Sequence, residues 1–279
     1  MADTPTSDQP GLAAPTNEIA HVVGVMSGKG GVGKSLVTGL LACALQRAGY
    51  RVGVLDADVT GPSIPIMFGL TERPEVTELG IFPIETRSEI MAISINLFLS
   101  RPDEGVIWRG PLISNLVRQF WQDVHWGKLD YLVVDLPPGT ADVPLTLMQS
   151  LPLDGMVIVT SPQDLAAMVV RKAVDMCEKM HVPILGLVQN MAYLTCPGCG
   201  EVVYPFGEAD GERLAREMGI PHLLDLPIDP ELSARSDQGT IEDYAPNPFA
   251  AQVDTLSARL EAVRQERKAE VPDASDVAG

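Results

Sequence analysis

Short runs of apolar residues alternate along the chain with segments whose apolar residues recur at helical spacing. The apolar runs predict buried strands at residues 21–26, 51–55, 90–95, 131–135, 156–160 and 184–189, with a short strand near 224–227. The helical patterns lie at residues 34–48, 112–124, 144–151, 165–180, 211–218 and 248–267. Strands that alternate with helices predict an α/β fold, a mostly parallel sheet covered by helices on both faces. Functional side chains are then expected at the carboxyl ends of the strands.

The same pattern predicts one folded domain at residues 19–268, between disordered tails at 1–18 and 269–279. The polar segment 71–87, with Pro74 and Pro83, is interpreted as an insertion or mobile loop. The last helix carries an apolar stripe that includes Phe249 and Leu256. Because its charges are mixed and acidic residues follow it, packing on the domain is favoured over membrane contact.

Composition narrows the classes of function. The 279 residues are 46% hydrophobic but only 5% aromatic, so Val, Ile, Leu and Ala are expected to fill a large core. A formal net charge of −17 argues against nonspecific binding to nucleic acid and to anionic membranes. The first residues contain no Lys or Arg and resemble neither a signal nor a transit peptide, so a cytoplasmic location is expected. Four cysteines in such a chain do not suggest disulfides.

A glycine-rich segment, GKGGVGKS at residues 28–35, joins the first predicted strand to the first helix. It fits the phosphate-binding P-loop, G-x-x-x-x-G-K-[ST], in the strand–loop–helix setting that this motif requires. The backbone N–H groups of Gly28, Gly30, Gly31, Val32 and Gly33 would surround phosphate at a helix N-terminus. Lys34 would supply a charge to the outer phosphates, and Ser35 a hydroxyl to Mg²⁺. A mere glycine-rich turn is disfavoured because both flanking elements are present.

Two further strands are expected to end at this site in acidic residues. The apolar run YLVVD ends at Asp135, the Walker B pattern of an Mg²⁺-binding aspartate. The second strand is followed by Asp56 and Asp58. The alternative for this pair is that both carboxylates cap the next helix.

A Cys-Pro-Gly-Cys turn places Cys196 and Cys199 two residues apart. Two thiolates can ligate one metal centre, but a tetrahedral zinc site or a [4Fe-4S] cluster usually needs four ligands. Cys43 and Cys177 lie within helical patterns and are predicted to be small buried residues. One chain therefore supplies half a site, and a twofold homodimer would complete four thiolates on its axis. A zinc knuckle and a redox dithiol are the alternatives, the latter without a thioredoxin-like context.

These motifs together resemble the Mrp/Nbp35 (ApbC-like) iron–sulfur cluster carriers, P-loop ATPases with a deviant Walker A loop. The resemblance rests on GKGGVGKS, DADVTGPS, WRGP at 108–111, DYLVVDLPPGT, VTSPQDLA at 159–166 and NMAYLTCPGCG at 190–200, and it spans residues from about 21 to 250. WRGP, DLPPGT and the setting of CPGC distinguish this family from MinD and ParA, which share the deviant loop.

The resemblance implies an ATPase with slow ATP hydrolysis, a homodimer, and a bridging [4Fe-4S] cluster that is passed to recipient apo iron–sulfur proteins. It implies that Lys29 reaches across the dimer to the partner's nucleotide and that Asp58 orients the attacking water or helps to hold Mg²⁺. It also implies that Asn190 and the loop containing Pro227 and Asp229 contact adenine. The expected ligands of the chain are thus ATP, Mg²⁺ and the cluster.

The sequence departs from the family at several positions, and two other functions stay open. Leu36 stands where the family usually has Thr, so weaker ATP binding is expected. Gln189 replaces a usual Glu, and residues 208–210 replace a glycine-rich run. The alternatives are a MinD/ParA-like positioning ATPase, which the acidic composition and the two cysteines disfavour, and a zinc-stabilised dimeric nucleotide switch.

Overall fold

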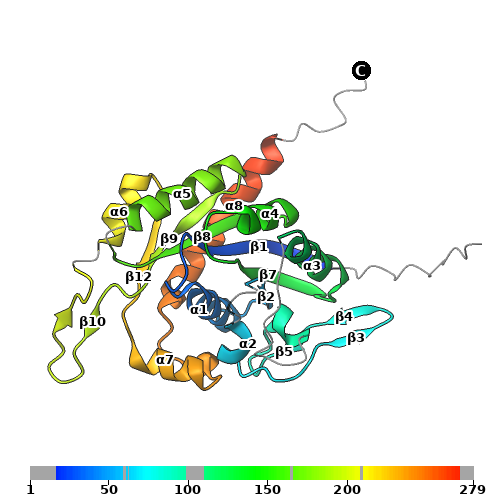
Figure 1. The fold of residues 1–279 in the computed structure, drawn as a ribbon, viewed down its shortest axis with the longest axis horizontal. Coiled ribbons are helices and arrows are strands. Elements are labelled where there is room, and N and C mark those ends of the chain that lie inside the picture. The colour runs from blue at the N-terminus through cyan, green and yellow to red at the C-terminus, as the bar shows by residue number, and fades with distance from the viewer. Residues whose placement is uncertain are drawn as a thin grey trace, which may run out of the picture.

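The fold is built around one twisted sheet, seen in a computed structural model that describes residues 17–58, 61, 63–98, 110–163, 166–207 and 210–270 (Figure 1). The eight strands have the order β12-β9-β8-β1-β7-β2-β6-β5, and every neighbouring pair except β5–β6 is parallel. Their bounds are β1 Glu18–Ser27, β2 Val52–Asp56, β5 Ile84–Glu85, β6 Met91–Ser94, β7 Lys128–Asp135, β8 Gly155–Thr160, β9 Ile184–Gln189 and β12 His222–Asp225. The predicted mostly parallel α/β sheet is confirmed.

Helices cover both faces of this sheet (Figure 1). On one face lie α1 (Lys34–Arg47), α2 (Ile64–Met67), α7 (Pro230–Asp237) and α8 (Val253–Glu270), and on the other α3 (Gly110–Asp123), α4 (Asp142–Ser150), α5 (Ala166–Lys179) and α6 (Gly211–Met218). The short 3-10 helices are η1 (Ile95–Phe98), η2 (Ile241–Asp243) and η3 (Pro248–Gln252). Side chains alternate along the strands, so that in β1 Val23 and Val25 enter one core while Val22 and Met26 enter the other.

The C-terminal segment packs on the domain, as its apolar stripe predicts. Phe249, Val253, Leu256 and Leu260 are all buried in the same core as α1. Within the described residues, no helix has both the length and the apolar character that a bilayer span requires. Most residues of the two predicted disordered tails, 1–16 and 271–279, lie outside the described part.

The segment predicted as an insertion or mobile loop, 71–87, contains regular structure. Strands β3 (Glu75–Thr77) and β4 (Gly80–Phe82) form an antiparallel hairpin, and β5 pairs with the edge of the main sheet. The turn is possible because Gly80 adopts a φ of 133°, which residues with a Cβ rarely reach. A second hairpin, β10 (Leu194–Thr195) with β11 (Val202–Val203), carries the Cys-Pro-Gly-Cys turn.

Candidate functional site

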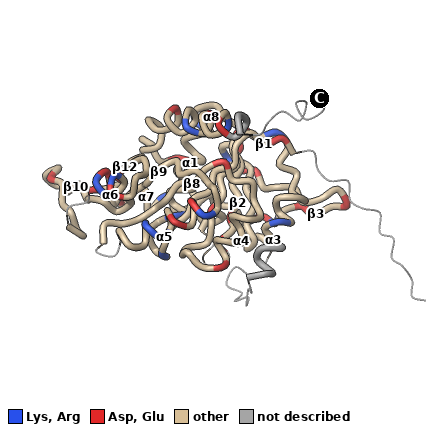
Figure 2. Tube along the Cα trace, turned by 90° about the horizontal axis from the view of Figure 1, so that it is seen from above, with Lys and Arg blue, Asp and Glu red and all other residues tan. Residues whose placement is uncertain are grey.

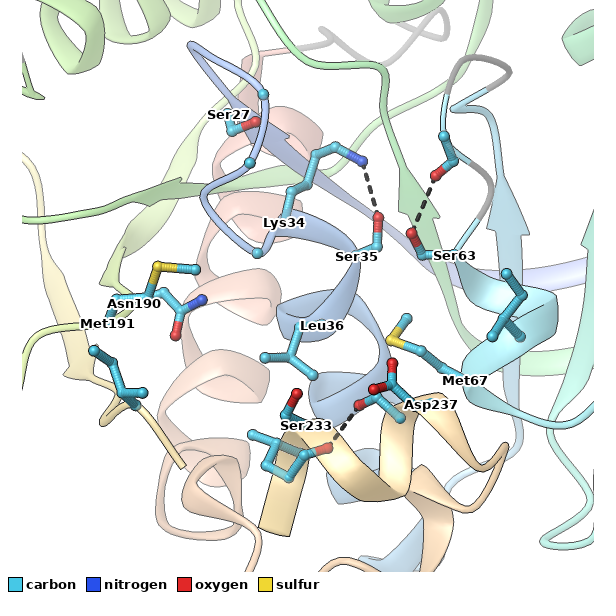
Figure 3. A pocket seen from close by; sticks show the side chains of 18 of the residues that line it. Ser27, Lys34, Ser35, Leu36, Ser63, Met67, Asn190, Met191, Ser233 and Asp237 are labelled. Carbon is cyan, nitrogen blue, oxygen red and sulfur yellow. Dashed lines mark hydrogen bonds between the residues drawn. The ribbon is translucent and has the colours of Figure 1, made fainter. Parts of the chain in front are cut away.

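A cavity of about 680 Å³ lies at the carboxyl ends of the central strands (Figure 3). It is lined by the glycine-rich loop with the start of α1, by the segment around α2, by the segment from Pro227 to α7, and by Pro138, Asn190 and Met191. The predicted residues that line it are Gly30, Gly31, Gly33, Lys34, Ser35, Asp58, Asn190, Pro227 and Asp229. The structure thus brings these residues together at the edge of the sheet where the sequence analysis expects a site, and the site itself and the role of each residue stay predictions.

The glycine-rich loop is held from behind by a side chain distant in sequence. Asn190, at the end of β9, is buried and donates its Nδ2–H to the carbonyl of Val32 over 2.9 Å. Gly33 has a φ of 83°, and a Cβ placed there would lie 2.1 Å from Asn190 Nδ2. Only glycine therefore fits between the loop and this amide. The arrangement fixes the loop's backbone where α1 begins.

Lys34 and Ser35 converge on the carboxylate at the end of β7. Lys34 Nζ lies 2.7 Å from Asp135 Oδ1, and Ser35 donates its hydroxyl to Asp135 Oδ2 over 2.6 Å. Thr38, one turn further along α1, donates to Asp135 Oδ1 over 2.9 Å. Asp135 is fully buried, so these charge-assisted contacts replace its hydration. The predicted Walker B arrangement is present, and Thr38 is a member that the sequence analysis did not identify.

The two aspartates after β2 face the same lysine from a second strand. Asp58 Oδ2 lies 3.3 Å from Lys34 Nζ, and both side chains are buried. Asp56 accepts the backbone N–H of Asp58 over 3.1 Å and the hydroxyl of Ser94 over 2.9 Å. The N-cap residue of α2 is Ser63 rather than either aspartate. The remainder of the DADVTGPS segment at 59, 60 and 62 lies outside the described residues.

Burial and mutual charge shift the titration of this cluster. Burial raises the pKa of Asp56 well above its ordinary value, and the neighbouring charge of Asp135 raises it further. Burial alone would lower the pKa of Lys34, but Asp135 and Asp58 outweigh it and raise that pKa. Lys34 thus stays charged and stabilises closely spaced acids that would otherwise repel one another. A cluster of oxygen ligands with one fixed ammonium suits a divalent cation beside phosphate.

Lys29 and Gly28 lie at the start of the loop and do not line the cavity. Lys29 Nζ donates to the side-chain oxygen of Gln163, in the segment after β8; Gln163 is exposed and Lys29 is partly exposed. A Cβ on Gly28 would lie 2.1 Å from Val169 Cγ1, so Gly28 allows the loop to pass close to α5. The sequence analysis assigned no role to Gln163, and the structure places it in contact with Lys29. Neighbouring Asp164 lies outside the described residues.

The far end of the cavity is formed by α7, a helix that the sequence analysis missed. Asp229 caps this helix through the N–H groups of Glu231 and Leu232 and also accepts the hydroxyl of Tyr244 over 2.6 Å. Burial and Asp229 raise the pKa of that tyrosine. The Asp229-Pro230 pair, an N-cap followed by proline, was a usable signal for the helix. One face of α7 lines the cavity with Leu232, Ser233, Ser236 and Asp237. Adenine contacts by Asn190, Pro227 and Asp229 stay a prediction.

The two cysteines of the predicted metal site lie apart from this cavity, on the β10–β11 hairpin (Figure 1). The turn is closed by backbone hydrogen bonds from Cys196 to Glu201 and from Gly200 to Cys196, each 2.8 Å long. Cys199 is exposed and Cys196 partly so. The backbone N–H groups of Cys199 and Gly198 lower the pKa of Cys196. An accessible thiol that ionises readily is suited to bind a metal.

The other two cysteines take no part in this turn. Cys43 in α1 and Cys177 in α5 are buried, as predicted, and burial raises the pKa of each thiol to about 12. Among the described residues, no three His, Cys, Asp or Glu side chains gather into a group that could hold a metal ion. Within the described chain, Cys196 and Cys199 thus remain a pair. The first two residues of the WRGP segment, 108 and 109, lie outside the described residues, and the last two begin α3.

A family model described as ParA: NUBPL iron-transfer P-loop NTPase matches residues 18–261. Among curated relatives, an iron–sulfur cluster carrier protein of Clostridium perfringens is 45% identical over 240 residues, 83% of this chain and 84% of the relative. One of Methanocaldococcus jannaschii is 46% identical over 225 residues, 80% and 78% of the two chains. The cytosolic Fe-S cluster assembly factor NUBP2 of Bos taurus is 40% identical over 251 residues, 87% and 92% of the two chains.

Solved structures also match the chain over most of its length. A nucleotide-binding protein of Archaeoglobus fulgidus in complex with ADP matches with a TM-score of 0.75 and 46% identity, over 83% of this chain and 91% of that one. The cell division ATPase MinD of Pyrococcus furiosus matches with a TM-score of 0.61, over 87% of this chain and 98% of that one. The MinD protein is only 21% identical and so bears on the fold alone.

Proposed function

This chain belongs to the family of iron-transfer P-loop NTPases that the matching model describes, and we propose that it is an ATP-hydrolysing carrier of [4Fe-4S] clusters. The observation that carries the proposal is the pairing of two features in one chain: a cavity lined by the glycine-rich loop, Lys34 and Ser35, and a turn with two accessible thiols. A positioning ATPase has no evident use for the second feature.

Mg·ATP would be bound at the β1–α1 end of the cavity. The N–H groups of the glycine-rich loop and the ammonium of Lys34 would bind the phosphates. These residues fit Mg²⁺, because the Ser35 hydroxyl and the Asp135 carboxylate are hard oxygen ligands that lie at hydrogen-bond distance from each other. Bound there, Mg²⁺ would neutralise charge that develops on the phosphates. Asp58, which lies opposite Asp135 across Lys34, would orient the attacking water.

The cluster, which is the cargo of the protein, would be held by Cys196 and Cys199 of two copies. Two thiolates per chain make half of the usual four-ligand set, so a twofold homodimer would complete it. In such a dimer Lys29, which is partly exposed at the start of the loop, would reach the partner's nucleotide. Hydrolysis would then change the fit between the subunits and release the cluster to an apo iron–sulfur protein.

Anaerobic reconstitution with iron and sulfide, followed by analysis of both elements, tests this function. The proposal expects thiolate-to-iron absorption and a protein that loses its iron when Cys196 and Cys199 are both replaced by Ala. Cys43→Ala is the matched control, since this buried thiol should be dispensable. A double variant that retains the full cluster would refute the proposal. Zinc retained without iron uptake would favour a zinc-stabilised nucleotide switch instead.

A further inference from the structure

Exposed apolar side chains gather directly after the Cys-Pro-Gly-Cys turn. Val202, Val203, Tyr204 and Phe206 are each 45–47% exposed. The other large apolar side chains with comparable exposure among the described residues are Ile66, Val76, Leu79 and Met168, which lie on three other segments. Four such residues within five positions form a patch, whereas exposed apolar residues are usually scattered singly. The apolar residues of this hairpin therefore need a partner surface.

The hairpin is also poor in charge within a strongly acidic chain. Residues 194–207 contain a single charged side chain, Glu201, while the whole chain has a formal net charge of −17. The tube around β10 is correspondingly almost free of red and blue, whereas neighbouring α6 carries both (Figure 2). Two copies of an acidic protein repel each other, so they approach most easily where charge is sparse. This argues for a second copy of the chain as the partner.

Register places the patch beside the thiols. Thr195, which precedes Cys196, pairs with Val202, and Leu194 pairs with Val203. Because side chains alternate across a strand, Val203 shares one face of the ribbon with Leu194 and Cys196, and Val202 and Tyr204 lie on the other face. Apolar side chains on both faces of a two-stranded ribbon suit a hairpin that a partner surrounds.

We propose that Val202, Val203, Tyr204 and Phe206, which lie on both faces of this ribbon, form an apolar collar around the thiolate site, closed by the same residues of a second copy. This inference rests on the proposed cluster-carrying function, because the site needs two copies to be complete. The collar stabilises the dimer by burying aromatic surface, and it limits the access of water and dioxygen to the cluster. It assigns to these residues a role in holding and protecting the cargo, distinct from ligation.

The test compares two double variants. Tyr204→Ser/Phe206→Ser removes the collar's aromatic rings, and Val76→Ser/Leu79→Ser removes two apolar side chains of the β3–β4 hairpin that are even more exposed. Each protein is reconstituted anaerobically, and the dimer dissociation constant and the rate of cluster bleaching in air are measured. The collar variant is expected to bind iron at high protein concentration, to dimerise about 100-fold more weakly and to bleach faster. The control should match the wild type.

A collar variant with wild-type dimerisation and bleaching would overturn the inference while leaving the cluster-carrying function intact. If such a variant only transferred its cluster more slowly to an apo acceptor, the patch would belong to the recipient, and the collar would again be wrong. A wild-type chain that takes up no iron would instead refute the function itself. Tyr204→Leu/Phe206→Leu keeps the apolar character and should behave nearly as the wild type, which separates loss of the collar from misfolding.

Discussion

The contact between Asn190 and the glycine-rich loop yields a sharp prediction about nucleotide binding. Asn190→Ala removes the buried 2.9 Å hydrogen bond that the Asn190 amide donates to the Val32 carbonyl. Leaving such an acceptor unpaired costs about 1–3 kcal/mol. If the free loop relaxes to another conformation, it must return to the original one to bind phosphate, and part of this cost then reduces the binding free energy. A reduction of about 1.4 kcal/mol corresponds to a tenfold weaker affinity. The loss should be similar for ADP, GDP and pyrophosphate, because the loop binds only phosphate.

A second substitution, Gly33→Ala, allows a double-mutant cycle with Asn190→Ala. Gly33→Ala would place a Cβ 2.1 Å from Asn190 Nδ2, so the amide must move and its bond to Val32 is lost as well. The positive φ of 83° adds a strain of about 1–2 kcal/mol for any residue with a Cβ. Once Gly33→Ala has broken the bond, Asn190→Ala should cost little more. The double variant should therefore lose less pyrophosphate binding free energy than the two single variants lose in sum, and the difference should be about 1–3 kcal/mol.

Isothermal titration calorimetry with the three ligands measures all four corners of the cycle. Unfolding by urea serves as the control for stability, since the double variant must be folded to be compared. Strict additivity of the two losses would refute the idea that Asn190 acts through the loop. A loss confined to ADP, with pyrophosphate binding unchanged, would likewise refute it and would favour a direct contact between Asn190 and the base.

Three further predictions follow from single side chains. Leu36→Thr should strengthen ATP binding by about three- to tenfold in calorimetry, because Leu36 lines the cavity and a hydroxyl there can donate to phosphate; unchanged affinity would contradict it. In pulsed alkylation at neutral pH with mass spectrometry, Cys196 should react fast, while Cys43 and Cys177, with pKa values of about 12, should react only after unfolding. Burial raises the pKa of Asp56, so its ionisation in the unfolded chain lowers stability as pH rises above about 4. In urea titrations with a chelator present to remove divalent cations, the free energy of unfolding of Asp56→Asn should therefore increase relative to that of the wild type as pH rises. A difference between the two proteins that does not change with pH would refute this.

The main elements of the sheet could be predicted because their pattern is local. Residues 184–189 and 211–218 match β9 and α6 at both ends, and the other predicted strands and helices of the core differ by a few residues. The β3–β4 hairpin was missed because its strands of three residues are too short for a periodic signal. Helix α7 was missed because its hydrophobic pattern is weak, although Asp229-Pro230 marks its start.

The site could be predicted at the level of motifs but not of contacts. Strands that run parallel must end together, so the glycine-rich loop, Asp58 and Asp135 had to meet at one edge. The bonds from Thr38 to Asp135 and from Asn190 to Val32 join residues 97 and 158 positions apart. No local pattern encodes such pairs, because they depend on how α1 and β9 pack against the loop. The isolation of Cys196 and Cys199 on a hairpin likewise required the structure.

The central claim is that one chain holds half of a cluster site and that two chains complete it. Native mass spectrometry of anaerobically reconstituted protein, with Mg·ATP present, tests this most directly because it reports oligomeric state and metal content in one species. The account predicts a dimer that carries one [4Fe-4S] cluster and dissociates to metal-free chains when Cys196 and Cys199 are replaced by Ala. A monomer that carries a complete cluster, or a dimer that carries only zinc, would contradict it.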